Sequence, residues 1–142
     1  MKTVKEIMTD EVECVTLQDN VFEVATKMKQ FDVGFIPVVD GKKLIGVITD
    51  RDLVIRGYAE KRSGSASVEQ VMSGEQVVSV SPDTSVDDAA KLMASHKVRR
   101  LPVVENGELL GVVAIGDLAV RNIFENEAGE ALSEISEGVK SR

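Results

Sequence analysis

The sequence carries one pattern twice, first over residues 7–54 and again over residues 71–119. Pro37-Val38-Val39 in the first copy matches Pro102-Val103-Val104 in the second, and residues 46–53 match residues 111–118, in both cases 65 positions later. A chain that repeats one supersecondary unit is expected to fold as a pseudo-symmetric pair. Function is then expected where the two copies face each other, and differences between them should mark where the two halves of the site diverge.

Size and charge restrict the class of protein. The 142 residues fit one globule with two lobes, because either copy alone would bury too little apolar surface to be secure. The single cysteine, Cys14, excludes an intrachain disulfide. No segment is apolar over a bilayer's width, and the first residues do not lead into a signal-peptide core. With a net charge of −7 disfavouring broad nucleic-acid binding, we expect a cytoplasmic protein with neither a nucleic-acid nor a membrane partner.

Each copy predicts one short amphipathic helix. Apolar residues recur at i, i+3, i+4 and i+7, which is typical of one helical face. The members of this face are Val21, Val24, Ala25 and Met28 in the first copy, and Val86, Ala89, Ala90 and Met93 in the second. Asn20 and Ser85 precede these stripes as start signals, and residues 20–23 have the character of a capping box.

A hairpin is predicted after each helix, because two apolar runs flank a polar turn. The runs are residues 35–39 and 44–48 in the first copy and residues 101–104 and 109–114 in the second. Asn106-Gly107 is a strong turn signal, since both residues tolerate positive φ. A helix start follows each hairpin, at residues 50–56 and 115–121, and short runs at 12–16 and 77–81 could each add a leading strand. The fold class is therefore α+β (mixed α/β), with two β-α-β-β-α repeats.

Domain boundaries follow from these patterns. We expect a first repeat at 1–62, a small polar linker at 63–68, a second repeat at 69–125 and a polar C-terminal tail at 126–142. The tail has weak amphipathic character, so a helical extension and a frayed terminus both remain open.

The repeated pattern resembles a tandem CBS-domain pair, also called a Bateman module, over roughly residues 4–124. Ile7-Met8-Thr9 and Val71-Met72-Ser73 match the usual lead-in of each unit. The chain is similar to stand-alone CBS-pair proteins of prokaryotic type. The resemblance implies two repeats packed sheet to sheet, with two clefts that bind adenine nucleotides or related adenosyl ligands.

The same resemblance implies particular site residues. Asp52 and Asp117 take the place of the ribose ligand, and Thr49 that of a phosphate-side hydroxyl, with Arg51 beside it. In the second copy these last two places hold Ala114 and Gly116, a departure that weakens the case for phosphate binding there. Residues before the Pro-Val strand contact base and phosphate in the family; here these are Val33, Gly34 and Phe35, and Val98, Arg99 and Arg100. The Asp52 cleft would hold its base against Met72, Val77, Val78, Val98 and Pro102, and the Asp117 cleft near Met8, Val12, Glu13, Val33 and Pro37.

Elementary chemistry supports these positions independently of the family. A carboxylate can accept from two ribose hydroxyls, and a helix N-terminus favours phosphate. Gly46 and Gly111 lie inside predicted strands, where glycine often marks the close approach of another backbone or a ligand. Arg99 and Arg100 offer forked cations suited to phosphate oxygens, but which cleft they would serve stays open.

Each candidate also has a purely structural interpretation. Asp52, Asp117 and Thr49 could be helix caps, and Arg99 with Arg100 could be a solvated or interface pair. Met8, Met28, Met72 and Met93 are typical core-filling residues, Cys14 fits a buried small side chain, and His96 fits an exposed helix end.

Three functional hypotheses follow. The first is a regulatory module that binds an adenosine ligand such as AMP, ADP, ATP or an S-adenosylmethionine-like molecule, with no obligatory cofactor and with one tighter and one weaker site. The second is a ligand-independent oligomerisation module acting on an unidentified protein partner. The third, an enzyme, is disfavoured, because the sequence offers no nucleophile–base pair, no metal-ligand cluster and no GxxxxGK loop. The resemblance also implies a homodimer of CBS pairs through helical faces around Val54, Ile55, Val120 and Ile123.

Overall fold

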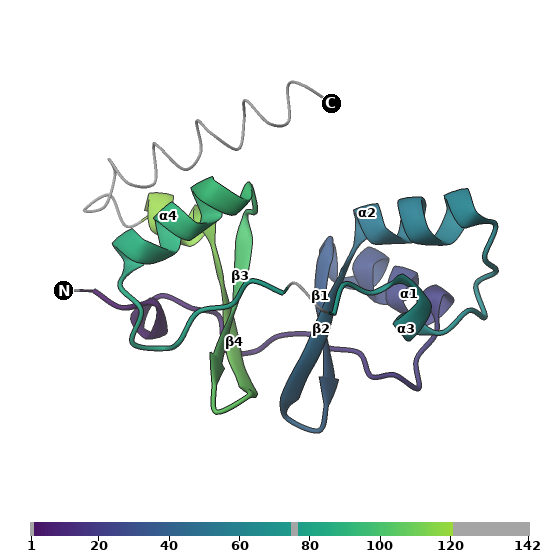
Figure 1. The fold of residues 1–142 in the computed structure, drawn as a ribbon, viewed down its shortest axis with the longest axis horizontal. Helices are drawn as coiled ribbons and strands as arrows, with labels where there is room; N and C mark the ends of the chain where they lie inside the picture. The colour runs from purple at the N-terminus through teal and green to yellow at the C-terminus, as the bar shows by residue number, and fades with distance from the viewer. Residues whose placement is uncertain (1, 75–76, 121–142) are drawn as a thin grey trace. The chain divides into compact units, whose positions relative to one another are not determined.

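The computed structural model describes residues 2–74 and 77–120 (Figure 1). The tail expected at 126–142 and the expected interface residue Ile123 lie outside the described residues. The chain forms two compact units. Of the described residues, the first-hairpin unit comprises 11–74, 77 and 107–109, and the second-hairpin unit comprises 2–10, 78–106 and 110–120. Within the described ranges, no helix is both long and apolar enough to span a membrane.

The first-hairpin unit contains the helix and hairpin that its sequence predicts. Helix α1 (Val21–Phe31) begins at a capping box, in which Asn20 Oδ1 accepts from the Glu23 N–H at 2.9 Å and Glu23 Oε1 accepts from the Asn20 N–H at 3.2 Å. Strands β1 (Phe35–Asp40) and β2 (Lys43–Thr49) form an antiparallel hairpin. Beyond β2 come α2 (Asp50–Asp52), the π-helical turn η2 (Leu53–Gly57), the 3-10 turn η3 (Tyr58–Glu60) and helix α3 (Val68–Val71). Its core residues are Val15, Val24, Met28, Ile36, Val38, Ile48, Val68 and Val71.

The second-hairpin unit repeats this plan. The 3-10 turn η1 (Val4–Glu6) comes first, and helix α4 (Val86–His96) begins where Ser85 Oγ accepts from the Asp88 N–H at 3.1 Å. Strands β3 (Arg100–Glu105) and β4 (Glu108–Ala114) form the hairpin, followed by helix α5 (Ile115–Val120). Its turn is the predicted one, with φ of 53° at Asn106 and 81° at Gly107. Val86, Ala89, Ala90 and Met93, which form the predicted stripe, are all buried in this unit's core.

The leading strands expected at 12–16 and 77–81 are not formed, and each run makes only one bridge to its hairpin. Val15 forms a single parallel bridge with Val38, and Val80 a single one with Val103. Val15 donates to the Pro37 carbonyl at 3.0 Å and Val80 to the Pro102 carbonyl at 3.0 Å. Extension of either ladder toward the start of its run, at residue 13 or 78, would require the N–H of Pro37 or Pro102, and proline has none.

Each compact unit takes its lead-in segment from the other sequence repeat. In the first-hairpin unit, Ser73 donates to the Val47 carbonyl at 2.8 Å and Val47 returns a bond to Ser73 at 2.9 Å. In the second-hairpin unit, Thr9 and Val112 exchange the same two bonds, both at 2.9 Å. The compact units therefore interleave along the chain, whereas the sequence repeats are consecutive. The repeat and linker boundaries at 1–62, 63–68 and 69–125 stay predictions.

Glycine makes these lead-in contacts possible, as its place inside a strand predicts. A Cβ added to Gly46 would lie 2.9 Å from the Ser73 carbonyl oxygen and 3.0 Å from Met72 Sδ. A Cβ added to Gly111 would lie 2.5 Å from the Thr9 carbonyl oxygen and 2.9 Å from Met8 Sδ. No side chain fits at either position without displacing the lead-in backbone.

We therefore expect Gly111→Ala to lower the free energy of unfolding by about 1–3 kcal/mol, which is the usual cost of overpacking. Gly116→Ala is the matched control, because no atom lies within 4 Å of an added Cβ there and the position is helical. Alanine should be neutral or stabilising at Gly116 by up to about 1 kcal/mol. Urea unfolding of both variants tests this, and equal effects would contradict it.

Candidate functional site

Asp52 lies where strand β2 turns into helix α2 and caps that helix. Its Oδ2 accepts from the Thr49 N–H at 2.9 Å, and its own N–H donates to Thr49 Oγ1 at 3.2 Å. These two bonds form a reciprocal capping box. The capping interpretation of Thr49 and Asp52 is thus confirmed, and it engages only one of the two carboxylate oxygens.

Asp117 occupies the matching place between strand β4 and helix α5. Its Oδ2 accepts from the Ala114 N–H at 2.9 Å. Ala114 has no hydroxyl, so the return bond that Thr49 makes in the other unit has no counterpart here. The departure noted in the sequence therefore removes a hydrogen bond from the cap, as well as a candidate phosphate contact.

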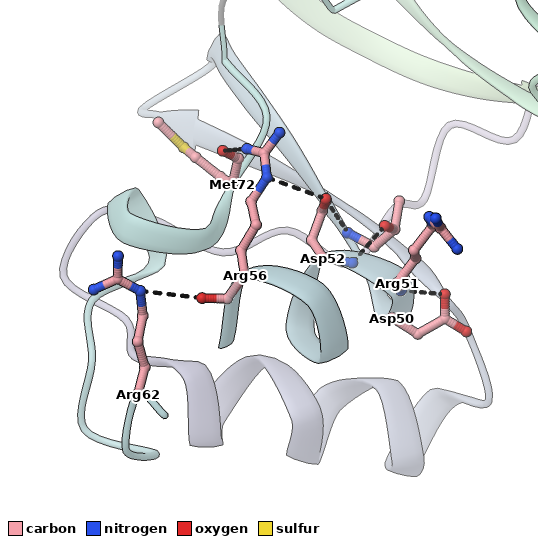
Figure 2. A network of polar contacts seen from close by, with 7 residues as sticks. Asp50, Arg51, Asp52, Arg56, Arg62 and Met72 are labelled. Carbon is pink, nitrogen blue, oxygen red and sulfur yellow. Dashed lines mark hydrogen bonds and ion pairs between the residues drawn. The ribbon is translucent and has the colours of Figure 1, made fainter. Parts of the chain in front are cut away.

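The second oxygen of Asp52 faces a basic side chain. Arg56 Nε lies 4.0 Å from Asp52 Oδ1, and Arg56 Nη1 donates to the Met72 carbonyl at 2.8 Å (Figure 2). Arg62 Nε donates in turn to the Arg56 carbonyl at 3.1 Å. The Asp52 side chain is 14% exposed and that of Arg56 50% exposed, so the carboxylate is much less accessible to solvent than the guanidinium.

Sequence reasoning gave Arg56 no role. The signal that could have found it is its i, i+4 spacing from Asp52 together with the matching Arg121 in the second copy. Arg121 itself lies outside the described residues.

Arg51 is placed differently from Arg56. Its side chain is exposed, and its backbone N–H donates to Asp50 Oδ1 at 2.8 Å. The Asp50 carboxylate lies over Gly34, where an added Cβ would be 2.9 Å from Asp50 Oδ2. The Asp50 N–H also donates to the Gly34 carbonyl at 3.0 Å, and Ile115 donates likewise to Arg99 at 2.9 Å. The two copies thus share this backbone tie, with a glycine in one and an arginine in the other.

The remaining predicted residues divide between the units. Met72 and Val77 share the unit of Asp52, and Met8 shares that of Asp117. The other residues predicted around Asp52 (Val78, Val98 and Pro102) and around Asp117 (Val12, Glu13, Val33 and Pro37) belong to the opposite unit in each case. Their convergence on either aspartate stays a prediction, as does the contribution of Phe35, Arg99, Arg100 and Gly116.

The methionines, His96 and the two arginines lie where their structural interpretations put them, whereas Cys14 is only half-buried. Met28 and Met93 are buried, while Met8 and Met72 pack partly buried against the two cores. His96 is exposed at the end of α4, and both Arg99 and Arg100 are exposed.

Cys14 is half-buried, and burial raises the pKa of its thiol although the nearby Lys27 ammonium opposes this shift. Lys27 Nζ donates to the Cys14 carbonyl at 2.8 Å and lies 3.8 Å from Glu13 Oε1. A raised pKa is the opposite of what activates a cysteine nucleophile. Among the described residues, no three His, Cys, Asp or Glu side chains are grouped as metal ligands would be.

Comparison with known proteins places these features in a family. Residues 4–57 and 68–121 each match the CBS domain. The chain belongs to the CBS domain family. The resemblance noted in the sequence is confirmed, and paired CBS domains are regulatory ligand-binding modules.

Individual CBS relatives cover nearly the whole chain. The chain is 49% identical to protein YlbB of Bacillus subtilis over 140 residues, which span 97% of this chain and 94% of that protein. The crystal structure of Hypoxic Response Protein I, solved with two coordinated zinc ions, is 31% identical with a TM-score of 0.77, covering 85% of this chain and 99% of that one. The CBS pair of protein MJ0100, in complex with 5′-methylthioadenosine and S-adenosyl-L-methionine, has a TM-score of 0.73 over 87% and 99%. Its identity is 24%, so this last likeness shows the fold alone.

The difference between the two caps makes a stability prediction. Thr49→Ala should lower the free energy of unfolding by about 1 kcal/mol, because the Asp52 N–H loses its acceptor. Ala114→Thr should raise it by about 0.5–1 kcal/mol, because the new hydroxyl can accept from the Asp117 N–H. Chemical denaturation of both CBS variants measures the two changes, and changes of the same sign would contradict the assignment of the caps.

Proposed function

We propose that this CBS pair is a cytoplasmic regulatory module that binds an adenosine-containing ligand, of the AMP, ADP, ATP or S-adenosylmethionine type. The ligand acts as a regulator and not as an obligatory cofactor, and its binding is passed on to a protein partner. Nucleic acid and membranes are not part of the proposal. The proposed function is binding without turnover.

One observation carries this proposal. In both units the aspartate at the strand end has one carboxylate oxygen fixed by a backbone N–H, at 2.9 Å in each case. Within the described residues, neither Asp52 Oδ1 nor Asp117 Oδ1 accepts a hydrogen bond. A carboxylate held in this way can accept from the two adjacent hydroxyls of a ribose, as acidic residues do in dinucleotide-binding folds. Capping therefore leaves Oδ1, and one lone pair of Oδ2, to accept from a ligand.

The adenosine class has separate support. Both small molecules named for the MJ0100 structure contain adenosine, which shows that the fold accommodates that moiety in one relative. We propose the same class for this chain because both of its repeats carry the aspartate that the family uses to bind the ribose.

The two sites should differ in affinity. Around Asp52 the chain offers the Thr49 hydroxyl and Arg51, whereas the matching places near Asp117 hold Ala114 and Gly116. We propose that the Asp52 site is the tighter one, because hydroxyl and guanidinium groups can both donate to phosphate oxygens.

A thermal-shift experiment tests the proposal with AMP, ADP, ATP and S-adenosylmethionine at millimolar concentration. A ligand at about 100 times its Kd stabilises the folded state by about 2.7 kcal/mol, so Tm should rise by several degrees. Asp52→Asn should remove most of this rise and Asp117→Asn little of it. Asparagine keeps an oxygen for the capping bond, so the loss reports the carboxylate charge and not the fold.

Asp40→Asn is the control, because Asp40 is exposed at the end of β1. The proposal fails if no adenosine ligand raises Tm, or if the doubly substituted protein keeps the full rise.

A second function, assembly without a ligand, is favoured by one surface. Val54, Ile55 and Tyr58 are 56%, 48% and 86% exposed on neighbouring positions after α2, which leaves an apolar face uncovered. Two of the residues expected at a dimer interface, Val54 and Ile55, are therefore accessible; nothing is described of the Val120 side chain.

If this face joins two copies, Ile55→Ser combined with Tyr58→Ser should convert a dimer into a monomer, because apolar contact area is lost on both sides of the interface. Sedimentation equilibrium measures the mass, with the exposed Leu17→Ser as a control elsewhere in the unit. A dimer that survives the double substitution would exclude this face.

A further inference from the structure

Arg56 connects the candidate ribose carboxylate to the lead-in segment 68–74. Its Nη1 donates to the Met72 carbonyl at 2.8 Å while its Nε lies 4.0 Å from Asp52 Oδ1 (Figure 2). All of these groups belong to the first-hairpin unit. One side chain therefore touches both a backbone group and the carboxylate proposed to bind the ligand.

The Met72 carbonyl is a fixed anchor for that side chain. Met72 follows the last turn of α3, and its neighbour Ser73 exchanges two backbone hydrogen bonds with Val47. Gly46 allows this approach, since any Cβ there would meet the Ser73 carbonyl and Met72 Sδ. From the other side, Arg62 holds the Arg56 carbonyl at 3.1 Å. Arg62 thus fixes the backbone of Arg56, while the guanidinium itself is held by its bond to the Met72 carbonyl and by its ion pair with Asp52.

The 4.0 Å separation decides what Arg56 does to Asp52. It is too long for a hydrogen bond, so it uses none of the lone pairs of Oδ1. It is short enough for attraction between unit charges, which resists rotation of the carboxylate about its bond to Cβ. Oδ2 has one bond, to the Thr49 N–H, and retains a lone pair. The carboxylate is therefore oriented while its capacity to accept two hydroxyls is preserved.

We propose that Arg56 is a positioning residue that makes the Asp52 site selective for a ribose carrying both the 2′- and the 3′-hydroxyl. This inference rests on the proposed function. Arg56 acts through Asp52 and does not touch the ligand. A direct contact between Arg56 and a phosphate is the competing possibility, and the two roles differ in which part of the ligand is discriminated.

Three probes separate these roles: AMP, 2′-deoxy-AMP and adenosine. The Kd ratio of 2′-deoxy-AMP to AMP reports recognition of the diol, and the ratio of adenosine to AMP reports recognition of the phosphate. Titration calorimetry in an Asp117→Asn background confines the signal to the Asp52 site. Arg56→Gln removes the charge and leaves an amide on a shorter side chain, and Arg56→Lys keeps the charge.

We expect Arg56→Gln to reduce the diol ratio by about fivefold to tenfold, because a misaligned carboxylate loses most of its charge-assisted bond to the second hydroxyl. The phosphate ratio should stay within about twofold. Arg56→Lys should retain most of the diol selectivity. Lys91→Met, which removes one exposed charge from α4, should change neither ratio.

The outcomes distinguish failure of the positioning role of Arg56 from failure of the proposed adenosine-binding function. An unchanged diol ratio in Arg56→Gln overturns the positioning role, and so does a fall in the phosphate ratio alone. If the parent protein binds none of the three probes, the proposed function itself fails and the role of Arg56 fails with it. Thermal unfolding of each variant without ligand shows whether a change in ratio accompanies a loss of fold, which would assign Arg56 a structural role only.

Discussion

The pairing of each hairpin with a lead-in segment from the other sequence repeat is the contact on which the rest of the structure depends. Two reciprocal backbone bonds hold Ser73 against Val47, and two more hold Thr9 against Val112. Glycines at 46 and 111 make room for them, because the lead-in backbone occupies the space of a side chain. Without these contacts neither compact unit is complete, since each would lose a segment that contributes to its core. This explains why the pattern is met twice in one chain: each copy supplies a part that the other lacks.

The same contact links fold to function in the first-hairpin unit. Because Ser73 is paired, the Met72 carbonyl is fixed, and because that carbonyl is fixed, Arg56 has a defined place beside Asp52. The capping box at Thr49 restrains the other carboxylate oxygen. A ligand that engages Asp52 would therefore act on a side chain already connected to the segment 68–74. Through Arg56, a ligand that changes the position of Asp52 would also act on the segment 68–74, with which the second sequence repeat begins.

Helix starts, turns and strand glycines could be predicted from the preferences of single residue types. Features that depend on contacts between distant parts of the chain could not. The Asn20 cap, the Asn106-Gly107 turn and the two strand glycines each follow from the preference of one residue type, and each is present as predicted. The leading strands did not form because their pairing cannot extend toward residues 13 and 78, where it would need the N–H of Pro37 and Pro102, which lie far along the chain from these runs. The exchange of lead-in segments could not be predicted, because the sequence shows two consecutive repeats and not the contacts between them. For the site, spacing identified both capping aspartates, but Arg56 became recognisable only through its distances to Asp52 and Met72.

Two positions that contact each other differ together between the copies: Gly34 with Asp50 in the first, and Arg99 with Ile115 in the second. In the first copy Asp50 begins α2 and its carboxylate lies over Gly34, so a Cβ at that position would require the exposed Asp50 side chain to move. In the second copy the matching helix begins at Ile115, which is buried in the core and leaves no carboxylate above position 99. Arg99 therefore meets no such carboxylate at the place that Gly34 fills in the first copy, while the backbone bond between the two positions is kept. An arginine in place of Gly34 would bring its side chain against the Asp50 carboxylate, which would have to rotate away. The charges near the two aspartates thus depend on the residue that begins each helix as well as on the residue at position 34 or 99.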